Sequence, residues 1–399
     1  MRIAGIIAEY DPFHKGHAAH IAATRAENGG KATHVVVVMS GNFTQRGEPA
    51  LVSKFHRTQM ALANGADLVL ELPLPWAMAP AESFASGGVA ILKALGCVDL
   101  LSFGSECGNI DVLRQLADVS TQTEYQAMLR NALSTGLPYA AAGQMAAAQV
   151  LGEEAASHLS SPNNTLGIEY IRAATLQQAN WDFFTLQRQG ALHNEEAPSQ
   201  GFAAASLLRK QIRSGKLEEA TAYMPTTANA VLIAAHSQGK TAVCTERVEA
   251  ALLGQLRRMS EPDFMQLPWI SEGIENRLYR TARTASDYHE LLAETKTRRY
   301  PMARLRRVLW SALIGMTAAD CTGLPPYIRV LGMNQRGRDI LSVATPSLPL
   351  LTRTSQLKDL DERSRRIFDL ECAATDLHAL SMRIPDPCGT DHTQKIIVE

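Results

Sequence analysis

The sequence has 399 residues, of which 46% are hydrophobic and 20% are charged, and its 39 basic and 40 acidic residues give a formal net charge of −1. This composition can form a buried core and excludes global disorder. The charge excludes a uniformly basic nucleic-acid binder but leaves room for a local basic face, and at about 150 residues per domain the length predicts about two to three domains.

The sequence also lacks the patterns of membrane and secreted proteins. It contains no apolar run of about 18 residues, so no membrane span is expected. The residues after Met1 lack a signal-peptide pattern. The six cysteines are scattered without a C-x-x-C pair, which predicts reduced thiols and no zinc site. We therefore predict a cytoplasmic protein without a structural metal, and nothing in the sequence indicates a protein partner.

The first hundred residues alternate apolar strands with helical segments. Strands apolar on both faces that alternate with helices are typical of a parallel sheet covered by helices, so we predict a Rossmann-like α/β fold. The expected strands are residues 3–8, 34–39, 67–72 and 99–103, and the expected helices are residues 17–26, 54–64 and 81–95.

The pattern changes twice further along the chain. Residues 110–158 are rich in Ala, Leu and Gln and are expected to be helical, and a strand at 181–186 and a helix at 201–214 follow. Beyond residue 226 only helical spacing remains. The helices expected there are residues 228–235, 246–259, 275–285 and 302–314. We therefore predict an α/β domain over residues 1–225, a mainly helical domain over 226–385 and a loose tail over 386–399.

The loop after the first strand carries the most distinctive residues. Ligands bind at the carboxyl ends of the strands in such sheets. His14 and His17 flank Gly16 there, and both imidazoles are expected to donate hydrogen bonds to phosphate oxygens. The helix that begins at Gly16 is expected to offer free N–H groups to a phosphate. A metal site formed with His20, or histidines without a role, are the alternatives, and no Cys or carboxylate follows at a matching offset to favour a metal.

The loop after the second strand is a candidate anion site. Asn42, Gln45 and Arg46 are expected to hold a small anion such as acetate or a phosphate group, and an ordinary polar loop is the alternative. Lys54 and Arg57 follow on one face of the next helix. They are expected to neutralise pyrophosphate or contact RNA, or else to form a solvated helix face.

Further polar residues follow the later strands. Glu71 and Glu106 are expected to orient a ribose hydroxyl or Mg²⁺. Gly104 leaves room for a nucleotide, and Asn163 with Asn164 is expected to cap a helix whose start faces the pocket. Arg188 closes a strand, where its charge suits an α-phosphate.

Positive charge is concentrated in the helical region. No acidic residue interrupts the stretch KTRRYPMARLRR, and Tyr300 lies within it, where its ring is expected to stack on a base or sugar. We predict an RNA-binding face here, although charge runs are often only solvated helix surface. Arg329, Arg336 and Arg338 are lesser candidates. The residues of this predicted face are Lys296, Arg298, Arg299, Tyr300, Arg304, Arg306 and Arg307.

Six blocks in order resemble one family. H-x-G-H after the first strand resembles the signature of the nucleotidyltransferase superfamily. The blocks GIIAEYDPFHKGH, VMSGNFTQRGEP, DLVLELP, FGSE, SPNNTLGIEY and KTRRYPMARLRRVLW together resemble the tRNA(Met) cytidine acetate ligase family, over about residues 1–345. The resemblance implies an α/β domain with the H-x-G-H motif, followed in the sequence by a C-terminal helical domain that binds tRNA. It also implies that ATP, with Mg²⁺, activates acetate as acetyl-adenylate, and that the acetyl group passes to the wobble cytidine of elongator tRNA(Met), which becomes N4-acetylcytidine.

The resemblance also implies which residues bind ATP. His14, His17 and Arg188 would be catalytic, and the altered positions are Asp11, where the family usually has Asn, and Ala204–Arg209, where it has an S-A-T-x-I-R type segment. Ser206 and Arg209 remain there as candidate triphosphate contacts. The implied ATP-binding residues are Ile7, Ala8, Glu9, Tyr10, Asp11, Pro12, Phe13, His14, Lys15, Gly16, His17, Ala18, Ala19, His20, Gly104, Asn163 and Arg188.

Two other functions stay open at this point. A nucleotidyltransferase that adenylylates a small phosphorylated metabolite would use the same histidines, but it would not need a second positive face. A non-catalytic RNA-binding protein would need the basic stretch alone, and the intact H-x-G-H motif argues against it.

Overall fold

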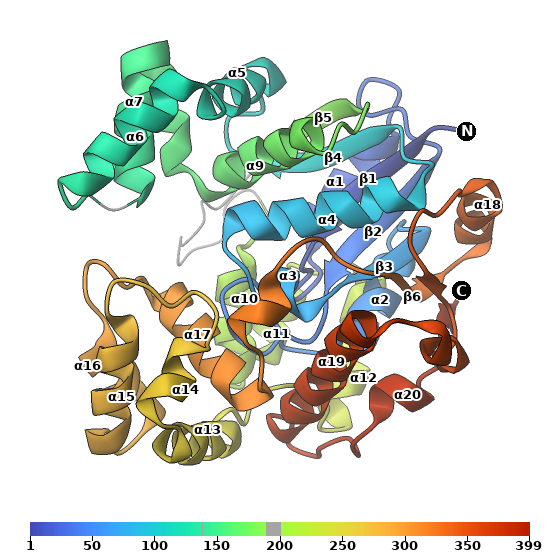
Figure 1. The fold of residues 1–399 in the computed structure, drawn as a ribbon. Helices are drawn as coiled ribbons and strands as arrows, with labels where there is room; N and C mark the ends of the chain where they lie inside the picture. The colour runs from blue at the N-terminus through green and yellow to red at the C-terminus, as the bar shows by residue number, and fades with distance from the viewer. Residues whose placement is uncertain (138, 189–200) are drawn as a thin grey trace.

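The structure is a computed structural model that describes residues 1–137, 139–188 and 201–399. Its centre is one twisted sheet with the strand order β5-β4-β1-β2-β3-β6-β7, and β8 also pairs with β6 (Figure 1). The strands are β1 (Ile3–Ala8), β2 (His34–Ser40), β3 (Leu68–Leu72), β4 (Leu100–Ser105), β5 (Asp182–Gln187), β6 (Ile328–Met333), β7 (Leu350–Leu351) and β8 (Ile397–Val398).

Helices cover both faces of this sheet. Those of the first 240 residues are α1 (Lys15–Arg25), α2 (Lys54–Leu62), α3 (Leu74–Ala77), α4 (Ala81–Leu95), α5 (Ile110–Ser120), α6 (Thr123–Ser134), α7 (Tyr139–Leu151), α8 (Glu153–Ser157), α9 (Pro162–Leu176), α10 (Ala205–Arg213), α11 (Leu217–Thr221) and α12 (Thr226–Ser237), with a short 3-10 turn at His158–Ser160.

The first of the later helices form a lobe below the sheet, and the chain then returns to the edge of the sheet (Figure 1). They are α13 (Glu246–Arg258), α14 (Glu261–Met265), α15 (Ile274–Thr284), α16 (Tyr288–Thr295), α17 (Met302–Ile314), α18 (Gln335–Val343), α19 (Glu362–Leu380) and α20 (Thr390–Thr393), with 3-10 turns at Ala318–Cys321 and Thr354–Asp359.

Strand β2 shows why the sequence folds into a two-faced sheet. Val36 and Val38 point into the core that α4 and α9 cover, whereas Val35 and Val37 point into the core that α2 and α12 cover. All four side chains are fully buried. A continuous apolar run is therefore what a central parallel strand requires. The predicted α/β class with a Rossmann-like, mostly parallel sheet and C-terminal helices is confirmed.

The edge strand β6 departs from the parallel pattern. It pairs antiparallel with β3, where Leu70 lies opposite Val330 and Glu71 opposite Arg329. The sequence Ile328–Met333 is an apolar run of the same kind as the other strands, and its six residues are all buried. The sequence analysis placed this segment in a helical region, so the antiparallel edge is a correction.

The hydrophobic cores group the residues differently from the expected boundaries at 225 and 385. Residues 252–312 form a separate core within the lobe of α13–α17. Helix α12 packs on the sheet core with α2, and β6 and α19 belong to the larger sheet core. The expected helical domain over 226–385 is therefore interrupted by segments that complete the α/β unit.

The last residues are also not a loose tail. Strand β8 pairs with β6, and Asp391 of α20 is buried with 1% of its surface exposed. Its carboxylate forms ion pairs with Lys54 and Arg329 at 2.7 and 2.6 Å. The charged partners explain why this polar segment is held against the sheet.

Candidate active site

Two adjoining cavities open at the carboxyl ends of β1, β4 and β5. The first, of about 250 Å³, is here named the histidine cavity because His14, His17 and His20 line it. The second, of about 190 Å³, is named the carboxylate cavity because Glu9 and Asp11 line it. Both cavities share His17, His20, Gly104 and Arg188. The sheet thus brings together residues from four of the six sequence blocks.

Hydrogen bonds from backbone N–H groups determine which ring nitrogen of His14 and of His17 carries the proton. His14 Nδ1 accepts a hydrogen bond from Gly16 N at 3.1 Å, and His17 Nδ1 accepts one from His14 N at 3.2 Å. The two rings stack with centroids 3.7 Å apart. A neutral imidazole that accepts at Nδ1 carries its proton on Nε2. Each histidine therefore presents an Nε2–H donor, and no described residue accepts from either.

The start of α1 differs from the expectation in one respect. Lys15 N donates to Tyr223 O, Gly16 N donates to His14 Nδ1, and His17 N donates to His14 O. These first-turn N–H groups are therefore occupied and are not the free phosphate donors that the sequence predicted. A Cβ on Gly16 would lie 2.9 Å from His14 Cε1, so glycine is required here for the close packing of the His14 ring.

Burial and Arg188 keep the three histidines neutral. Burial, with a smaller contribution from the charge of Arg188, lowers the pKa of His14 to about 3 and that of His20 to about 4. Burial and the neighbouring His14 and Arg188 lower the pKa of His17 well below its usual value. His20 Nε2 is bonded to Ser102 Oγ at 2.9 Å. His14 and His17 thus act as neutral hydrogen-bond donors near pH 7.

Arg188 supplies the positive charge of the histidine cavity. Its backbone N donates to Ser105 O at 2.9 Å, which fixes it just beyond the end of β5. Burial lowers the pKa of its guanidinium, and the carboxylate of Glu106 opposes this shift. No described residue accepts a hydrogen bond from this guanidinium. Gln189 and Gly190, which follow it in the LQRQG segment, lie outside the described residues.

The carboxylate of Asp11 is used by the fold. Its Oδ1 accepts a hydrogen bond from Leu51 N at 2.7 Å, and its Oδ2 lies 3.5 Å from Arg209 Nη1. Arg209 also donates to the backbone oxygen of Asp11 at 2.5 Å. Residues 204–209 therefore place Arg209 on the first-strand loop, where it neutralises the carboxylate of Asp11.

Glu106 forms hydrogen bonds with Asn163 and Asn164. The carboxylate of Glu106 accepts from Asn163 Nδ2 at 2.7 Å and from Asn164 N at 2.8 Å, and Asn164 Oδ1 accepts from Glu106 N at 2.9 Å. The N-cap residue of α9 is Ser161, and the first-turn N–H groups of this helix are satisfied by Glu106 rather than by the asparagine side chains. Both oxygens of Glu106 thus accept hydrogen bonds from the start of α9, and its role toward ribose or Mg²⁺ stays a prediction. Asn163 still lines the carboxylate cavity.

The loop after β2 splits into a buried and a site-facing part. Asn42 is fully buried, donates to Thr375 Oγ1 at 3.0 Å and accepts from Lys54 N at 2.7 Å, so its expected role in anion binding is corrected to an anchoring role. Gln45 lines the carboxylate cavity. Arg46 lies close enough to Glu9 and Arg209 for their charges to affect its pKa, which burial lowers.

Lys54, Arg57 and Glu71 are structural. Lys54 Nζ lies 2.5 Å from Glu71 Oε1, and Arg57 donates to the backbone oxygens of Glu9 and Ser40 at 2.7 and 3.0 Å. All three side chains are fully buried. They are therefore neither a solvated helix face nor ligands for pyrophosphate, RNA or Mg²⁺.

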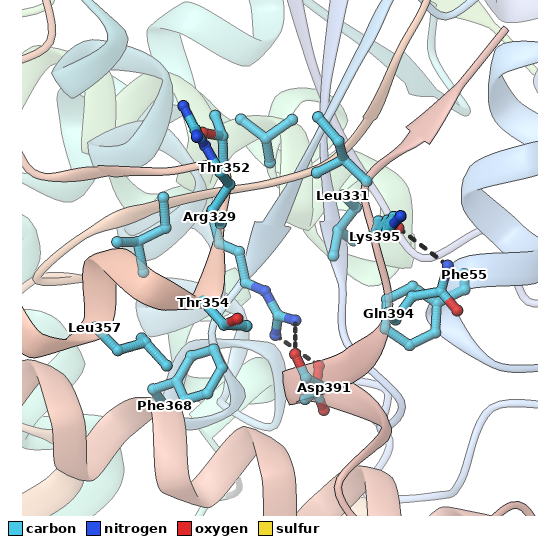
Figure 2. Close-up of a pocket in the computed structure, with 14 residues that line it drawn as sticks. Phe55, Arg329, Leu331, Thr352, Thr354, Leu357, Phe368, Asp391, Gln394 and Lys395 are labelled. Carbon is cyan, nitrogen blue, oxygen red and sulfur yellow. Dashed lines mark hydrogen bonds and ion pairs between the residues drawn. The ribbon is translucent and has the colours of Figure 1, made fainter.

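Arg329 belongs to the same buried cluster and not to an RNA-binding face. It pairs with Glu71 at 2.8 Å and with Asp391 at 2.6 Å. Figure 2 shows the Arg329 guanidinium directed at Asp391, beside a small cavity of about 30 Å³ near Phe368. Arg336 and Arg338 are exposed on α18.

The basic stretch between residues 296 and 307 is divided by the fold. Lys296, Arg298 and Arg299 are exposed. Arg306 pairs with Glu48, and Arg307 Nη1 donates to Gln45 O at 3.0 Å, so these two join the helical lobe to the β2 loop. The contact is close, because a Cβ on Gly47 would lie 2.4 Å from Arg307 N.

Tyr300 and Arg304 point into the lobe. Tyr300 is 8% exposed and packs in the core of the lobe, and its hydroxyl donates to Glu272 O at 2.6 Å. Arg304 donates to Trp269 O at 2.9 Å and pairs with Glu272 at 3.0 Å. The expectation that the Tyr300 ring stacks on a base is therefore corrected, since its ring is buried between helices.

The sequence analysis missed the aromatic walls of the site. Phe84, Phe103 and Tyr170 line the carboxylate cavity, and Phe202 lines the histidine cavity. These residues belong to apolar helix and strand patterns, which indicate burial but not a cavity. Phe103 alone had a usable signal, because it stands next to Gly104 at the end of a strand.

Neither a membrane-spanning helix nor a metal-binding cluster is present in the described residues. No helix in that part of the chain is long and apolar enough to cross a membrane. Within residues 1–137, 139–188 and 201–399, no group of three or more His, Cys, Asp or Glu side chains is arranged to hold a metal ion.

Comparisons of sequence place this chain among known enzymes. The family model described as HIGH Nucleotidyl Transferase matches residues 1–392. A protein of Acetivibrio thermocellus named tRNA(Met) cytidine acetate ligase is 38% identical over 100% of both chains. A protein of the same name from Caldanaerobacter subterraneus subsp. tengcongensis is 36% identical over 96% of each chain.

Solved structures have the same fold over the full length. Apo TmcAL of Thermotoga maritima superposes with a TM-score of 0.94 at 31% identity, covering 100% of this chain and 99% of that one. TmcAL of the same organism bound with alpha-thio ATP superposes with a TM-score of 0.91 over the same shares.

Proposed function

The chain belongs to the HIGH nucleotidyltransferase family and, within it, to the tRNA(Met) cytidine acetate ligases, and from this premise we propose that it activates acetate with ATP and acetylates elongator tRNA(Met). The acetyl group goes to the exocyclic amine of the wobble cytidine, which becomes N4-acetylcytidine. The observation that carries the proposal is the pair of Nε2–H donors of His14 and His17, set beside Arg188 in one cavity. That a relative of the same fold is bound with alpha-thio ATP supports it.

The first step is a displacement at the α-phosphorus of ATP. An acetate oxygen attacks this phosphorus, the bond to the β-phosphate oxygen breaks, and pyrophosphate leaves. His14 and His17 donate from Nε2 to the non-bridging α-phosphate oxygens, and Arg188 balances their charge. Donors that are fixed before the reaction stabilise the charge that develops in the transition state. Acetate is already ionised near pH 7, so this step needs no base.

The second step transfers the acetyl group to the tRNA. The cytidine amine attacks the acetyl carbonyl carbon, the bond from this carbon to the phosphate oxygen breaks, and AMP leaves. The mixed anhydride hydrolyses readily, so the site has to exclude water. Phe84, Phe103, Tyr170 and Phe202 provide apolar walls around the place where the anhydride would form.

In the part of the chain that the structure describes, no group of side chains forms a cage for Mg²⁺. The carboxylates of Asp11 and Glu106 are engaged by protein donors. Mg²⁺ commonly binds through substrate phosphates and its own waters. We therefore propose that any Mg²⁺ arrives with the triphosphate, and we assign no step to it.

The helical lobe is the proposed tRNA-binding unit. The lobe has its own hydrophobic core over residues 252–312, and Lys296, Arg298 and Arg299 are exposed on it. The contacts of Arg306 and Arg307 with the β2 loop fix the lobe relative to the cavities. These two residues and Arg304 would act mainly by positioning the lobe, and the three exposed residues would contact phosphates.

One assay tests the function. Purified protein is incubated with ATP, labelled acetate and unmodified elongator tRNA(Met), and label is measured in the tRNA. We expect transfer that requires both ATP and protein, and a His17→Ala variant should lose at least about 100-fold in rate. The control is His289→Ala, which changes an exposed histidine of the lobe. Absence of transfer by the wild-type protein would overturn the proposal, and a fully active His17→Ala variant would remove the phosphate role.

A further inference from the structure

Glu9 stands out among the carboxylates of the site. It follows β1 and lines the carboxylate cavity. Its Oε1 accepts a hydrogen bond from Gln45 N at 2.6 Å, and within the described residues no donor is bonded to its other oxygen. Asp11, which lines the same cavity, is engaged at both oxygens by Leu51 N and Arg209. Glu9 therefore presents the open carboxylate oxygen of this cavity.

The surroundings of Glu9 suit a flat, uncharged group that carries a donor. Phe84, Phe103 and Tyr170 give the carboxylate cavity aromatic walls, on which a nucleobase can stack. A carboxylate repels phosphate and acetate but accepts a hydrogen bond from the exocyclic amine of cytosine. The phosphates belong instead in the histidine cavity, which contains His14 and Arg188. The two cavities meet at His17, where an acyl group on the α-phosphate would face the amine.

The histidines cannot take the amine proton in this arrangement. His17 Nδ1 accepts from His14 N, so its remaining nitrogen carries a proton and is a donor. His20 Nε2 is bonded to Ser102 Oγ, and burial lowers the pKa of His20 to about 4, so this ring is a poor proton acceptor. The amine of cytidine is conjugated with the ring and is a weak nucleophile, so its attack on a carbonyl requires a group that removes the proton.

Resting on the proposed function, we propose that Glu9 is the catalytic base that accepts the proton of the cytidine amine during acetyl transfer. The nitrogen–carbon bond forms between the amine and the acetyl carbonyl. The bond between the carbonyl carbon and the phosphate oxygen breaks, and its electron pair leaves with AMP. The amine proton moves to the open oxygen of Glu9 and is released to solvent after the product departs.

The charged groups around Glu9 are consistent with a base. Burial is the largest influence and raises the pKa of Glu9, and Asp11 raises it further. The hydrogen bond from Gln45 N and the charges of Arg209 and Arg46 oppose this rise in pKa. Arg57 of α2 donates to the backbone oxygen of Glu9. Tyr170 of α9 lies close enough that the charge of Glu9 adds to the effect of burial, and both raise the pKa of Tyr170. A base whose pKa approaches the working pH transfers protons more effectively.

The test separates the two chemical steps. Glu9→Gln keeps an oxygen that can accept from Gln45 N but cannot take a proton. We expect acetate-dependent exchange between ATP and labelled pyrophosphate to stay within about twofold of wild type, and single-turnover acetyl transfer to slow by about 10²- to 10⁴-fold. The wild-type transfer rate should fall as the pH drops below the pKa of Glu9, and this fall should vanish in the variant.

A second variant and a control keep the test decisive. Glu9→Asp retains a carboxylate one methylene shorter, so it should transfer slowly but keep the pH dependence. Glu82→Gln, which changes a carboxylate with 62% of its side chain exposed, should behave as wild type. A Glu9→Gln variant that transfers within tenfold of wild type, or that loses exchange as much as transfer, overturns the role of Glu9 alone. A wild-type protein that never labels tRNA overturns the proposed function as well.

Discussion

Gly104 shows how one missing side chain shapes the site. A Cβ at this position would meet Arg188 Cγ at 3.5 Å, which is an ordinary contact, and its backbone needs no positive φ. The residue borders both cavities. A small side chain is therefore tolerated by the fold, whereas a large one would occupy the space that we assign to the nucleotide.

This contrast gives a prediction for ATP affinity. Gly104→Leu should raise the Kd for ATP at least about tenfold, because filling the cavity costs on the order of 1–3 kcal/mol of binding free energy. Gly104→Ala should change it by less than about threefold. Isothermal titration measures both affinities, and thermal unfolding of each variant checks that the fold is intact. Equal affinities for the Leu and Ala variants would contradict the placement of ATP beside Gly104.

The buried histidines also predict how stability depends on pH. Burial lowers the pKa of His378 to about 4, while its Nε2 is bonded to Ala50 O at 2.7 Å. In the unfolded chain the pKa of histidine is about 6.5, so the unfolded state binds more protons between these values. The contribution of buried, neutral His378 to the free energy of unfolding is therefore complete above about pH 6.5. This contribution is lost as the pH falls toward the pKa of His378 in the folded protein.

His378→Gln should accordingly lessen the loss of stability in acid. Its amide can still donate to Ala50 O, but it does not titrate. Between pH 7 and pH 5.5 the free energy of unfolding of the wild type should fall by about 1 kcal/mol more than that of the variant. Urea unfolding at the two pH values measures this, with His289→Gln as the exposed control. The same pH dependence in both variants would show that His378 is not buried in its neutral form.

At the scale of elements, α2 is held by charges far away in the sequence. Lys54 begins this helix and contacts Glu71 of β3, Glu371 of α19 and Asp391 of α20, and Arg329 of β6 joins the same group. Burial and the nearby Glu71 raise the pKa of Glu371 well above its usual value. When Glu371 keeps its proton, two cations face two carboxylates, so the buried cluster is electrically balanced.

Removing one of these charges should be costly. Burial alone would raise the pKa of Asp391, but Lys54 and Arg329 outweigh it and hold this pKa below its usual value. Asp391→Ala leaves buried cations unpaired and should lower the free energy of unfolding by about 3–5 kcal/mol. Asp386→Ala removes a partly exposed pair with Lys240 and should cost less than about 1 kcal/mol. Urea unfolding of both variants at pH 7 is the measurement, and similar losses would contradict the role of the buried cluster.

These elements also show what a sequence can predict. The strands β1 to β4 and the helix α4 follow directly from apolar runs and helical spacing, because a parallel sheet has to bury both faces. The H-x-G-H motif could be identified as a candidate phosphate-binding site because its residues lie next to each other in the sequence. The burial of Lys54 was not, since its partners at positions 371 and 391 come together with it only in the folded chain. The prediction that the Tyr300 ring stacks on a base was wrong for a similar reason, because the helices packed around this ring determine whether it reaches solvent.

At the scale of the whole molecule, the helical lobe lies between two segments that both belong to the sheet unit. Cys244 N donates to Ser381 O at 2.8 Å where the chain enters the lobe, and β6 pairs with β3 after the chain has left it. Figure 1 shows α13–α17 together on one side, away from α18 and both termini. The lobe is thus anchored at both ends and by the contacts of Arg306 and Arg307 with the β2 loop.

The exposed part of the basic stretch should determine the salt dependence of tRNA binding. The double variant Arg298→Ala with Arg299→Ala should weaken tRNA binding. It should also reduce the slope of log K against log salt by about 1.5, because fewer counterions are released on binding when two phosphate contacts are lost. ATP affinity should not change. Lys216→Ala with Lys358→Ala removes two exposed charges outside the lobe and serves as the control. Filter binding at several salt concentrations measures the slopes, and equal slopes would place the tRNA elsewhere.

The ion pairs of Lys54 also impose an order of events on protein synthesis. A ribosome that adds about 5–20 residues per second needs roughly 20 to 70 seconds to proceed from Lys54 to Asp391. During this time the first strands can pair, but Lys54 lacks its last carboxylate, and Asn42 lacks its partner Thr375. The loop that holds Gln45 beside Glu9 is therefore secured only near the end of translation. A nascent chain that stops before residue 391 would leave Lys54 and Arg329 with one carboxylate partner fewer, which should destabilise the attachment of α2.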